Sequence, residues 1–368
     1  MLRLGPTQLM VYLQGCPHMV EQEPPPDYAG KPTVYLDQNV LDLVVKEKYP
    51  AFFSRLMNDY QVVYSDETLR EIKRSGQPEV FLAALESMSA MHFKFQTDHT
   101  LQPTGGMLIT SHSPFQTYAT YLGIEPIYDV MLAAAHQTNL KLYGGRKDSS
   151  FSAISREQVE VFTAFMSHAS EQLALLGEEQ PEIATAMKQH MDMLQRQFEI
   201  ATEVSSGELE KYIDDASGQS GIQAYRSAVG VGPVQFNNVQ PPNVIRKLWD
   251  MHQELDGYKG MGYVIEDFVG ISLHPIYGRE MHQHEKVTSV YNVLNVIGYK
   301  PDSSLDKEHR HIAAISDAAH ASVASHSHVL LSADTAFVSK VRAIYEFLEI
   351  STNVYLVTFK DGQIWIED

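Results

Sequence analysis

Short apolar runs alternate with amphipathic stretches near the beginning of the chain. Residues 34–36 are uniformly hydrophobic and predict a buried strand that ends directly before Asp37. Residues 39–58 have helical periodicity, and residues 61–64 predict a second strand. Ser65 then stands at the N-cap position of another helix, ahead of two acidic residues. This order of strand, helix, strand and helix is typical of a parallel sheet.

The same alternation returns near the other end. Residues 309–326 form an alanine-rich helical pattern, and residues 328–331 are an apolar run that predicts a buried strand. A predicted helix over residues 336–348 and a predicted final strand over residues 354–357 follow. Neither end supplies enough strands for a stable sheet by itself. We therefore predict that the two ends fold against each other.

The middle of the chain has a different pattern. Four stretches have the periodicity of amphipathic helices, at residues 81–95, 128–143, 156–176 and 181–204. Breaks that contain glycine or proline separate the helical stretches, at residues 103–106, 144–145 and 231–242. The middle is therefore predicted to be mainly helical, and it carries no chemical signature of its own.

These patterns divide the chain into four parts. Residues 1–30 are predicted to be an N-terminal extension, in which EQEPPP indicates a stiff linker. Residues 31–80 and 305–368 are the two parts of one α/β domain, and residues 81–304 form a large, mainly α-helical insertion between them. The expected fold class is α/β, with a central parallel sheet.

The composition is that of a folded protein in a reducing compartment. Hydrophobic residues make up 44% of the chain and charged residues 20%, which excludes a disordered protein. No run approaches the ~18 apolar residues of a membrane-spanning helix, and the opening residues do not have the pattern of a signal peptide. Cys16 is the only cysteine, so an internal disulfide and a cysteine-based zinc site are excluded. We expect a cytoplasmic protein without a membrane partner.

The net charge of −18 restricts the kind of nucleic acid that the chain could bind. Binding to phosphate groups is driven largely by Lys and Arg, so avid and non-specific coating of DNA is not expected. A carboxylate site can still bind phosphate through a metal ion. A nucleic-acid substrate would therefore be held by few backbone contacts.

Carboxylates occur where a parallel sheet would place a ligand site. Asp37 ends the first predicted strand, and Asp334 follows the strand over residues 328–331. Ligands bind in the crevice beyond the carboxyl ends of parallel strands. Glu71 lies on the helix after the second strand, and Asp317 lies on an otherwise apolar helix. Such a set suits a hard divalent cation, because clustered carboxylates repel one another without one.

Three segments resemble, in order, the PIN-domain nuclease family. VYLDQNVL at residues 34–41 is similar to the opening strand of PIN domains, and SDETLREI at residues 65–72 is similar to the segment with the second acid. SDAAHASVASHSHVLLSADTAF at residues 316–337 resembles the carboxyl half. The resemblance covers residues 31–80 and 305–360. The separation between its two halves is far longer than in compact PIN domains.

The resemblance implies a PIN-like three-layer fold and a metal-dependent nuclease that most often acts on RNA. Mg²⁺ or Mn²⁺ would activate water for phosphodiester hydrolysis, so no protein nucleophile is needed. Asn39 and Ser332 would orient carboxylates or water. The implied metal-binding and catalytic residues are Asp37, Glu71, Asp317 and Asp334, with Glu71 preferred to Asp66 and Glu67.

Other side chains have both functional and ordinary interpretations. His320 shares a helix face with Asp317 and could support the site, although core and surface histidines are more common. The basic side chains that could contact phosphate are Arg70, Lys73, Arg74, Lys340 and Arg342, and solvated helix charges are about as frequent. Zinc-binding histidine pairs at 282/284 and 309/311 are disfavoured, because helical residues two apart point to different sides. The chain also has no H-E-x-x-H motif.

Three functions fit this sequence. The leading one is an RNA-cleaving or structure-selective nuclease. Its helical insertion would choose the substrate, hold the site inactive, or bind a protein partner or regulator. The second is a catalytically inactive PIN-like scaffold, which the acidic charge favours and the retention of all four acids disfavours. The third is a hydrolase that applies the same metal chemistry to a small nucleotide.

Overall fold

The computed structural model describes most of the chain from residue 28 onward. The described residues are 28–98, 103–123, 136–176, 181–213, 219–230, 232–256, 258–260, 262–275, 277–360 and 363–367. Most of the predicted N-terminal extension and residues 128–135 of a predicted helix lie outside them. The strands are β1 (Thr33–Leu36), β2 (Gln61–Ser65), β3 (Met91–Thr97), β4 (Pro103–Thr110), β5 (Val329–Ser332), β6 (Asn353–Lys360) and β7 (Gln363–Glu367).

The helices fall into three groups along the chain. Those of the first part are α2 (Gln38–Val45), α3 (Pro50–Asp59), α4 (Asp66–Arg74) and α5 (Pro78–Ser87). Those of the middle are α7 (Gln137–Leu142), α8 (Phe151–Leu176), α9 (Pro181–Tyr212), α10 (Gly221–Val229), α11 (Pro233–Phe236), α12 (Val244–Gln253) and α13 (Ile265–Phe268). Those of the last part are α14 (Gln283–Ile297), α15 (Glu308–Ala324) and α16 (Thr335–Phe347).

The two ends of the chain form one mostly parallel sheet of seven strands. Its order is β4-β3-β2-β1-β5-β6-β7. The five inner strands run parallel, whereas β4 and β7 pair antiparallel at the edges. β1 pairs with β5, its neighbour from the far end of the sequence, with Tyr35 opposite Leu330. The prediction that the two ends meet is confirmed.

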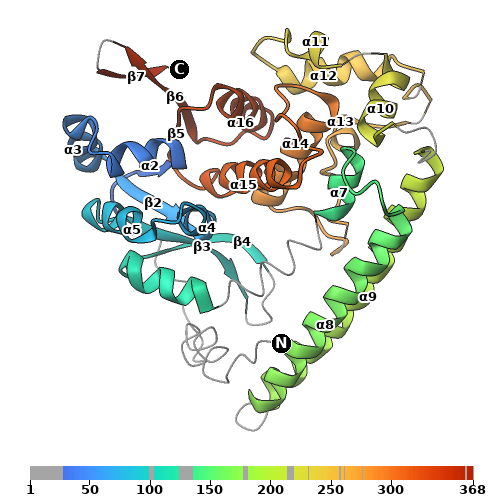
Figure 1. Ribbon diagram of the computed structural model, residues 1–368, viewed down its shortest axis with the longest axis horizontal. Coiled ribbons are helices and arrows are strands. Elements are labelled where there is room, and N and C mark those ends of the chain that lie inside the picture. Colours follow the sequence, from blue (N-terminus) through green and yellow to red (C-terminus); the bar gives the residue numbers. More distant parts are fainter. Residues whose placement is uncertain are drawn as a thin grey trace.

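Helices cover both faces of the sheet and make it the middle layer of three (Figure 1). Alternate side chains of β1 point to opposite faces. Val34 and Leu36 pack with residues of α2 to α5, and Tyr35 packs with residues of α14, α15 and α16. Burial on both faces explains why the inner strands have continuous apolar runs.

The predicted helix over residues 39–58 is two helices. α2 ends at Val45, and α3 begins at Pro50. Tyr49 between them has a left-handed backbone with φ of 56°. Proline is well suited to the first position of a helix but lacks the N–H that a continuing helix would need.

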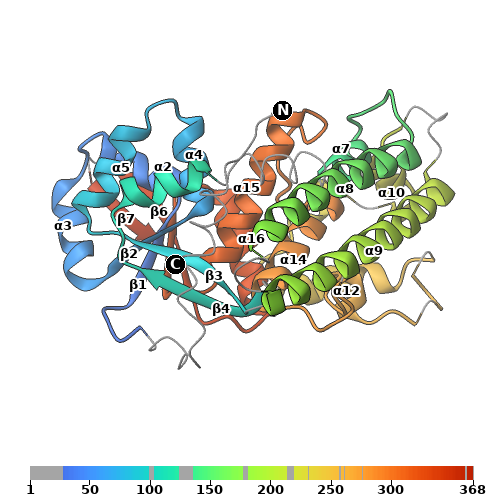
Figure 2. The same ribbon diagram turned by 90° about the horizontal axis from the view of Figure 1, so that it is seen from below.

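The predicted boundary at residue 80 is too early. The sheet continues through β3 and β4 to Thr110, so residues 91–95 form a strand and not a helix. The predicted break at residues 103–106 lies inside β4. The predicted boundary at residue 305 is too late. α14 lies before it in sequence but packs on α15 and α16 of the last part. The middle is nevertheless mainly helical, and α8 and α9 form a long hairpin beside the sheet (Figures 1 and 2). Among the described residues, no helix combines the length and hydrophobicity needed to cross a membrane.

A buried histidine on α15 gives the fold a predicted acid sensitivity. His311 lies against the rings of His136 and Tyr143, and burial, with the neighbouring charge of His136, lowers its pKa from 6.5 to about 4. The unfolded chain therefore binds a proton below pH 6.5 that the folded chain excludes until about pH 4. Stability is unaffected above pH 6.5 and falls, by at most about 3 kcal/mol, as the pH drops through this window.

Urea unfolding between pH 7.5 and 4.5 measures this effect. We expect His311→Leu to remove part of the acid-induced loss of stability and His309→Leu, at an exposed position of the same helix, to leave it unchanged. Parallel stability curves for His311→Leu and the unmodified chain would contradict the prediction.

Candidate metal centre

Asp37 lies at the carboxyl end of β1 and is held there by three donors. The backbone N–H of Gln38 donates to Oδ1 at 2.7 Å as Asp37 caps α2. The side chains of Asn39 and Ser332 donate to Oδ2 at 2.6 and 2.5 Å. Ser332 ends the neighbouring strand β5, so the pairing of β1 with β5 brings this donor to Asp37. Asn39 and Ser332, to which the resemblance assigned an orienting role, both hydrogen-bond the carboxylate of Asp37.

Glu71 approaches Asp37 from α4, which packs against α15. Its Oε1 accepts from Ser316 at 3.3 Å and from Arg74 at 3.4 Å. Its Oε2 lies 3.1 Å from Nε2 of His320. Burial acts to raise the pKa of Glu71, but the nearby charges of His320 and Arg74 outweigh it and leave the pKa lowered.

His320 reaches the same place from α15. Its side chain is only 1% exposed, and Nδ1 lies 2.7 Å from the hydroxyl of Tyr35. That hydroxyl also contacts Ser65 Oγ at 2.8 Å and Thr68 Oγ1 at 3.1 Å. The contact with Tyr35 fixes the imidazole so that Nε2 faces the carboxylates. His320, which the sequence suggested only as a supporting residue, is therefore a potential metal ligand.

Ligand atoms of Asp37, Glu71 and His320 all lie within 4.8 Å of one another. We call these three residues the ligand group. Within the described part of the chain, no other set of three His, Cys, Asp or Glu residues meets this criterion, and neither of the disfavoured histidine pairs belongs to such a set. Burial and the charge of Glu71 raise the pKa of Asp37, against the opposing effects of His320 and Ser332.

Asp317 and Asp334 lie next to the ligand group but outside it. Asp317 precedes His320 by one turn of α15 and makes no hydrogen bond or ion pair with any described residue. Burial, together with the charges of Asp302 and Asp37, raises its pKa to about 8. Asp334 is exposed and caps α16 by accepting from the N–H of Phe337 at 2.9 Å. The four predicted acids thus do not all reach one common point.

Sequence reasoning missed three residues beside this set. Asp302 lies in the loop before α15 and accepts from Asn295 at 2.9 Å. The hydroxyl of Tyr291 lies 3.5 Å from the same oxygen. Burial raises the pKa of Tyr291 well above 10, and the charges of Asp317, Asp302, Asp334 and Asp37 act in the same direction. We call the ligand group with Asp302, Asp317 and Asp334 the acidic centre.

Two of the predicted phosphate contacts are not on a surface rim. Lys340 is 0% exposed and pairs with Asp302 at 2.7 Å, because it lies on the face of α16 that packs against α14. Arg342 donates to the backbone carbonyls of Val354 and Glu367 at 2.9 and 2.7 Å, over the C-terminal strands. The sequence could not distinguish these positions from solvated ones.

The predicted basic residues on α4 lie closer to the ligand group. Arg70 pairs with Glu67 at 2.5 Å. Arg74 donates to Ser316 at 2.9 Å as well as to Glu71, and its side chain is 38% exposed. Lys73 is exposed on the same helix. Arg74 is therefore a partly exposed cation in direct contact with the ligand group.

The donors of the ligand group suit a divalent cation. Glu71 Oε2 and His320 Nε2 are buried and have no hydrogen-bond partner, although they face each other. Buried polar atoms are normally satisfied, so such a pair indicates a position for a ligand or an ion. Carboxylate oxygens bind hard cations such as Mg²⁺ and Mn²⁺, whereas imidazole nitrogen favours transition metals.

Ser332→Ala tests the support of Asp37. The substitution removes the donor to Asp37 Oδ2, and losing such an outer contact typically lowers metal affinity about 10- to 100-fold. We expect this loss in Mn²⁺ titration calorimetry. Ser327→Ala is the matched control, because Ser327 is also buried beside β5 but bonds only to backbone oxygens. Equal Mn²⁺ affinities of the two variants would contradict the assignment.

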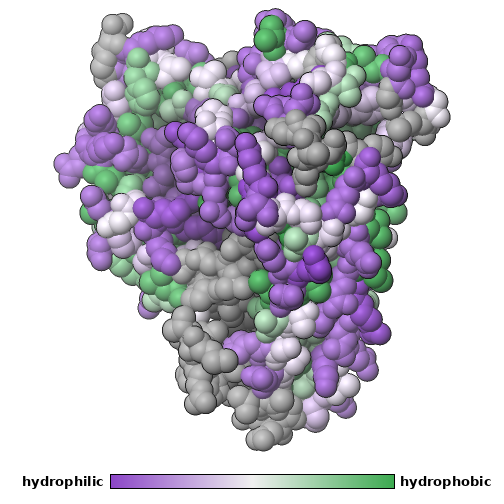
Figure 3. All heavy atoms as spheres, turned by 45° about the vertical axis from the view of Figure 1, so that its right-hand side comes forward, coloured by the Kyte–Doolittle hydropathy of each residue, from purple (hydrophilic) through white to green (hydrophobic). Residues whose placement is uncertain are grey.

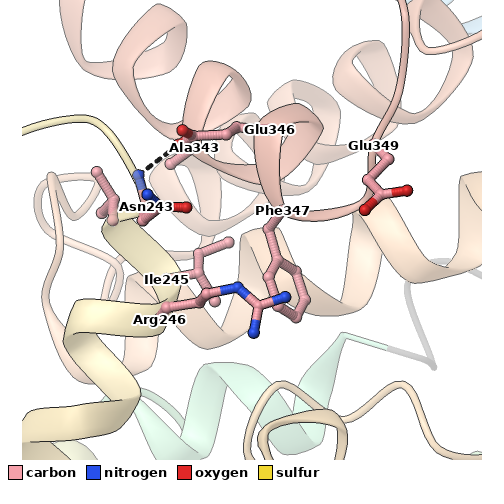
Figure 4. A pocket seen from close by; sticks show the side chains of 8 residues that line it. Asn243, Ile245, Arg246, Ala343, Glu346, Phe347 and Glu349 are labelled. Carbon is pink, nitrogen blue, oxygen red and sulfur yellow. Dashed lines mark hydrogen bonds between the residues drawn. The ribbon is translucent and has the colours of Figure 1, made fainter.

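A separate hollow lies at the other end of α16 (Figure 4). It lies between the start of α12 and the end of α16, where Arg246 covers the ring of Phe347 and Glu346 accepts from the N–H of Asn243 at 2.9 Å. No residue of the acidic centre lines it. The face drawn in Figure 3 is mainly hydrophilic, with scattered apolar side chains. The acidic centre therefore remains the strongest candidate site.

No protein-family model, curated protein or solved structure matches this chain in the comparisons. The acidic centre and the α/β fold with its mostly parallel sheet are therefore the features that bear on the chemistry of this chain.

Proposed function

We propose that this chain is a metal-dependent phosphodiester hydrolase with a PIN-like fold, and that its substrate is RNA. One observation carries the proposal: Asp37, Glu71 and His320 bring ligand atoms within 4.8 Å of one another from three separate elements. They do so at the carboxyl edge of a parallel sheet, where ligands of such folds bind. The order of acids along the chain and the resemblance to PIN domains add support.

Each residue would have a distinct task. Asp37, Glu71 and His320 would hold one Mn²⁺ or Mg²⁺ ion. Such an ion supplies Lewis acidity, which activates water and stabilises negative charge on a phosphoryl group. Ser332 keeps the Asp37 carboxylate oriented. Asp317, with a pKa raised by burial to about 8, can hold or release a proton near neutral pH in the metal-free protein.

The charge distribution favours a substrate held by few contacts. The net charge is −18, and the cations nearest the ligand group, Arg70 and Arg74, already pair with Glu67 and Glu71. A single strand that reaches the site through one or two phosphates fits this surface better than a long duplex.

Cleavage of labelled oligonucleotides by the full chain tests the proposal. We expect single-stranded RNA to be cut in the presence of Mn²⁺, to be cut more slowly with Mg²⁺, and to remain intact with a chelator. Cleavage of a single-stranded DNA of the same sequence shows whether the protein acts on RNA alone or on DNA as well. Asp37→Asn purified in parallel excludes a contaminating nuclease. Intact RNA and DNA at a Mn²⁺ concentration that saturates the protein would end the nuclease proposal.

A catalytically inactive PIN-like scaffold is the second candidate. The observation in its favour is that Lys340 and Arg342, two of the expected phosphate contacts, are bonded inside the protein. This candidate predicts Mn²⁺ binding without cleavage and a protein partner for the helical middle. A small nucleotide as substrate is distinguished by release of phosphate from a nucleotide with the oligonucleotides left intact.

A further inference from the structure

Lys340 is a completely buried lysine beside the acidic centre. Its Nζ lies 2.7 Å from Asp302 Oδ1 and 3.1 Å from Asn295 Oδ1. It also lies 4.0 Å from the centre of the Tyr291 ring. Burying an ammonium group is costly unless it is paired and hydrogen-bonded. The position therefore needs a local excess of negative charge.

Asp302 is the main source of that charge, and Asp317 and Asp334 add to it. Burial lowers the pKa of Lys340, and the charges of Asp302, Asp317 and Asp334 act in the opposite direction. The charges that act on Glu71 come instead from His320 and Arg74. The acidic centre thus has two halves. The Glu71 half is the ligand group, and the Lys340 half consists of Asp302, Asp317 and Asp334.

The hydrogen bonding of the two halves differs. In the Lys340 half, Asn295 donates to Asp302 Oδ2 at 2.9 Å and accepts from the N–H of Asp302 at 3.1 Å. The lysine and the carboxylate of Asp302 are thereby fixed and satisfied. In the Glu71 half, Glu71 Oε2 and His320 Nε2 lie 3.1 Å apart and have no hydrogen-bond partner other than each other. The Lys340 half already contains a lysine ammonium group, whereas in the Glu71 half the two facing atoms can both turn to a metal ion as ligands.

We propose that the ammonium group of Lys340 takes the place of a second divalent cation, so that the acidic centre binds a single metal ion at Asp37, Glu71 and His320. Two-metal sites hold their ions about 4 Å apart between shared carboxylates. Here Asp317 would be the shared carboxylate, because it precedes His320 by one turn of α15 and the charges of both His320 and Lys340 act on it. This inference rests on the metal site of the proposed function but not on the reaction.

Counting Mn²⁺ ions tests the inference without measuring activity. The full chain, stripped with a chelator, is titrated with Mn²⁺ by calorimetry and by the paramagnetic resonance signal of free Mn²⁺. We expect one ion per unmodified chain. Lys340→Met should bind a second ion, because Asp302, Asp317 and Asp334 are then left without a cation.

Matched variants control for indirect effects. Lys286→Met removes a lysine of α14 that pairs with Glu280, and it should leave the number of bound Mn²⁺ ions at one. Asp302→Asn combined with Lys340→Met should also bind one ion, because a ligand of the second position is lost together with the lysine.

Several outcomes overturn the inference. They are two ions bound by the unmodified chain, no ion bound, or one ion bound by Lys340→Met. The count on the unmodified chain keeps the test decisive if Lys340→Met does not fold. Two ions with RNA cleavage would refute this inference and leave the proposed function standing. One ion without cleavage of any substrate would refute the function alone.

Discussion

Asp37→Asn is expected to reduce Mn²⁺-dependent RNA cleavage by on the order of 10³-fold. A Lewis-acidic ion contributes several kcal/mol to stabilising the transition state, and each 1.36 kcal/mol corresponds to a factor of ten in rate. Asparagine retains the size of the side chain and one oxygen but removes the charge that holds the ion. Mn²⁺ affinity should fall together with the rate.

Asp42→Asn is the matched control for this prediction. Asp42 lies on the same helix α2, forms an exposed ion pair with Lys46, and has no contact with the ligand group. It should leave both the cleavage rate and the Mn²⁺ affinity unchanged. An Asp37→Asn protein that remains folded, as judged by circular dichroism, and cleaves at the unmodified rate would exclude Asp37 from the reaction.

Asp302→Asn is expected to be the most destabilising change in the acidic centre, at about 3–5 kcal/mol. It leaves the buried ammonium group of Lys340 without the carboxylate that pairs with it directly, and breaking a buried pair from one side has a cost of this size. Lys340→Met should destabilise less, because the Asp302 side chain is 19% exposed and its carboxylate can be hydrated. Urea unfolding at neutral pH measures the difference.

The double variant makes this prediction specific. Asp302→Asn combined with Lys340→Met removes both charges and should recover most of the stability lost in Asp302→Asn. Glu208→Gln, which breaks the exposed pair with Lys211 on α9, should cost less than about 1 kcal/mol. If Asp302→Asn is as stable as this surface variant, Lys340 is not charged in the folded protein.

The parallel centre of the fold could be predicted because its strands are buried on both faces. β1, β2 and β5 have apolar runs that end at polar residues. The end of β1 indicates the position of Asp37, and the end of β5 indicates that of Ser332. β3 and β4 were missed because they are partly exposed and have mixed side chains. Such strands do not differ clearly from helices in a single sequence.

The candidate site was predictable only in part, for a similar reason. His320 could be noticed because it shares a helix face with Asp317, a local relation. Asp302 and Tyr291 are brought beside the ligand group by the packing of α14, α15 and α16. No local sequence pattern indicates that these residues lie there. Lys340 was misplaced because a lysine on a helix is usually solvated, and only the fold places it inside.

Asp37 and Ser332 are joined by a hydrogen bond although 295 positions separate them in sequence. During translation, the amino-terminal acids leave the ribosome long before the serine and His320 exist. A polypeptide released early by a premature stop therefore lacks His320 and Ser332 and cannot complete the proposed centre. If the chain is a nuclease, its activity appears only after almost the whole protein has been synthesised. The messenger RNA that encodes it is therefore not cleaved by an incomplete chain.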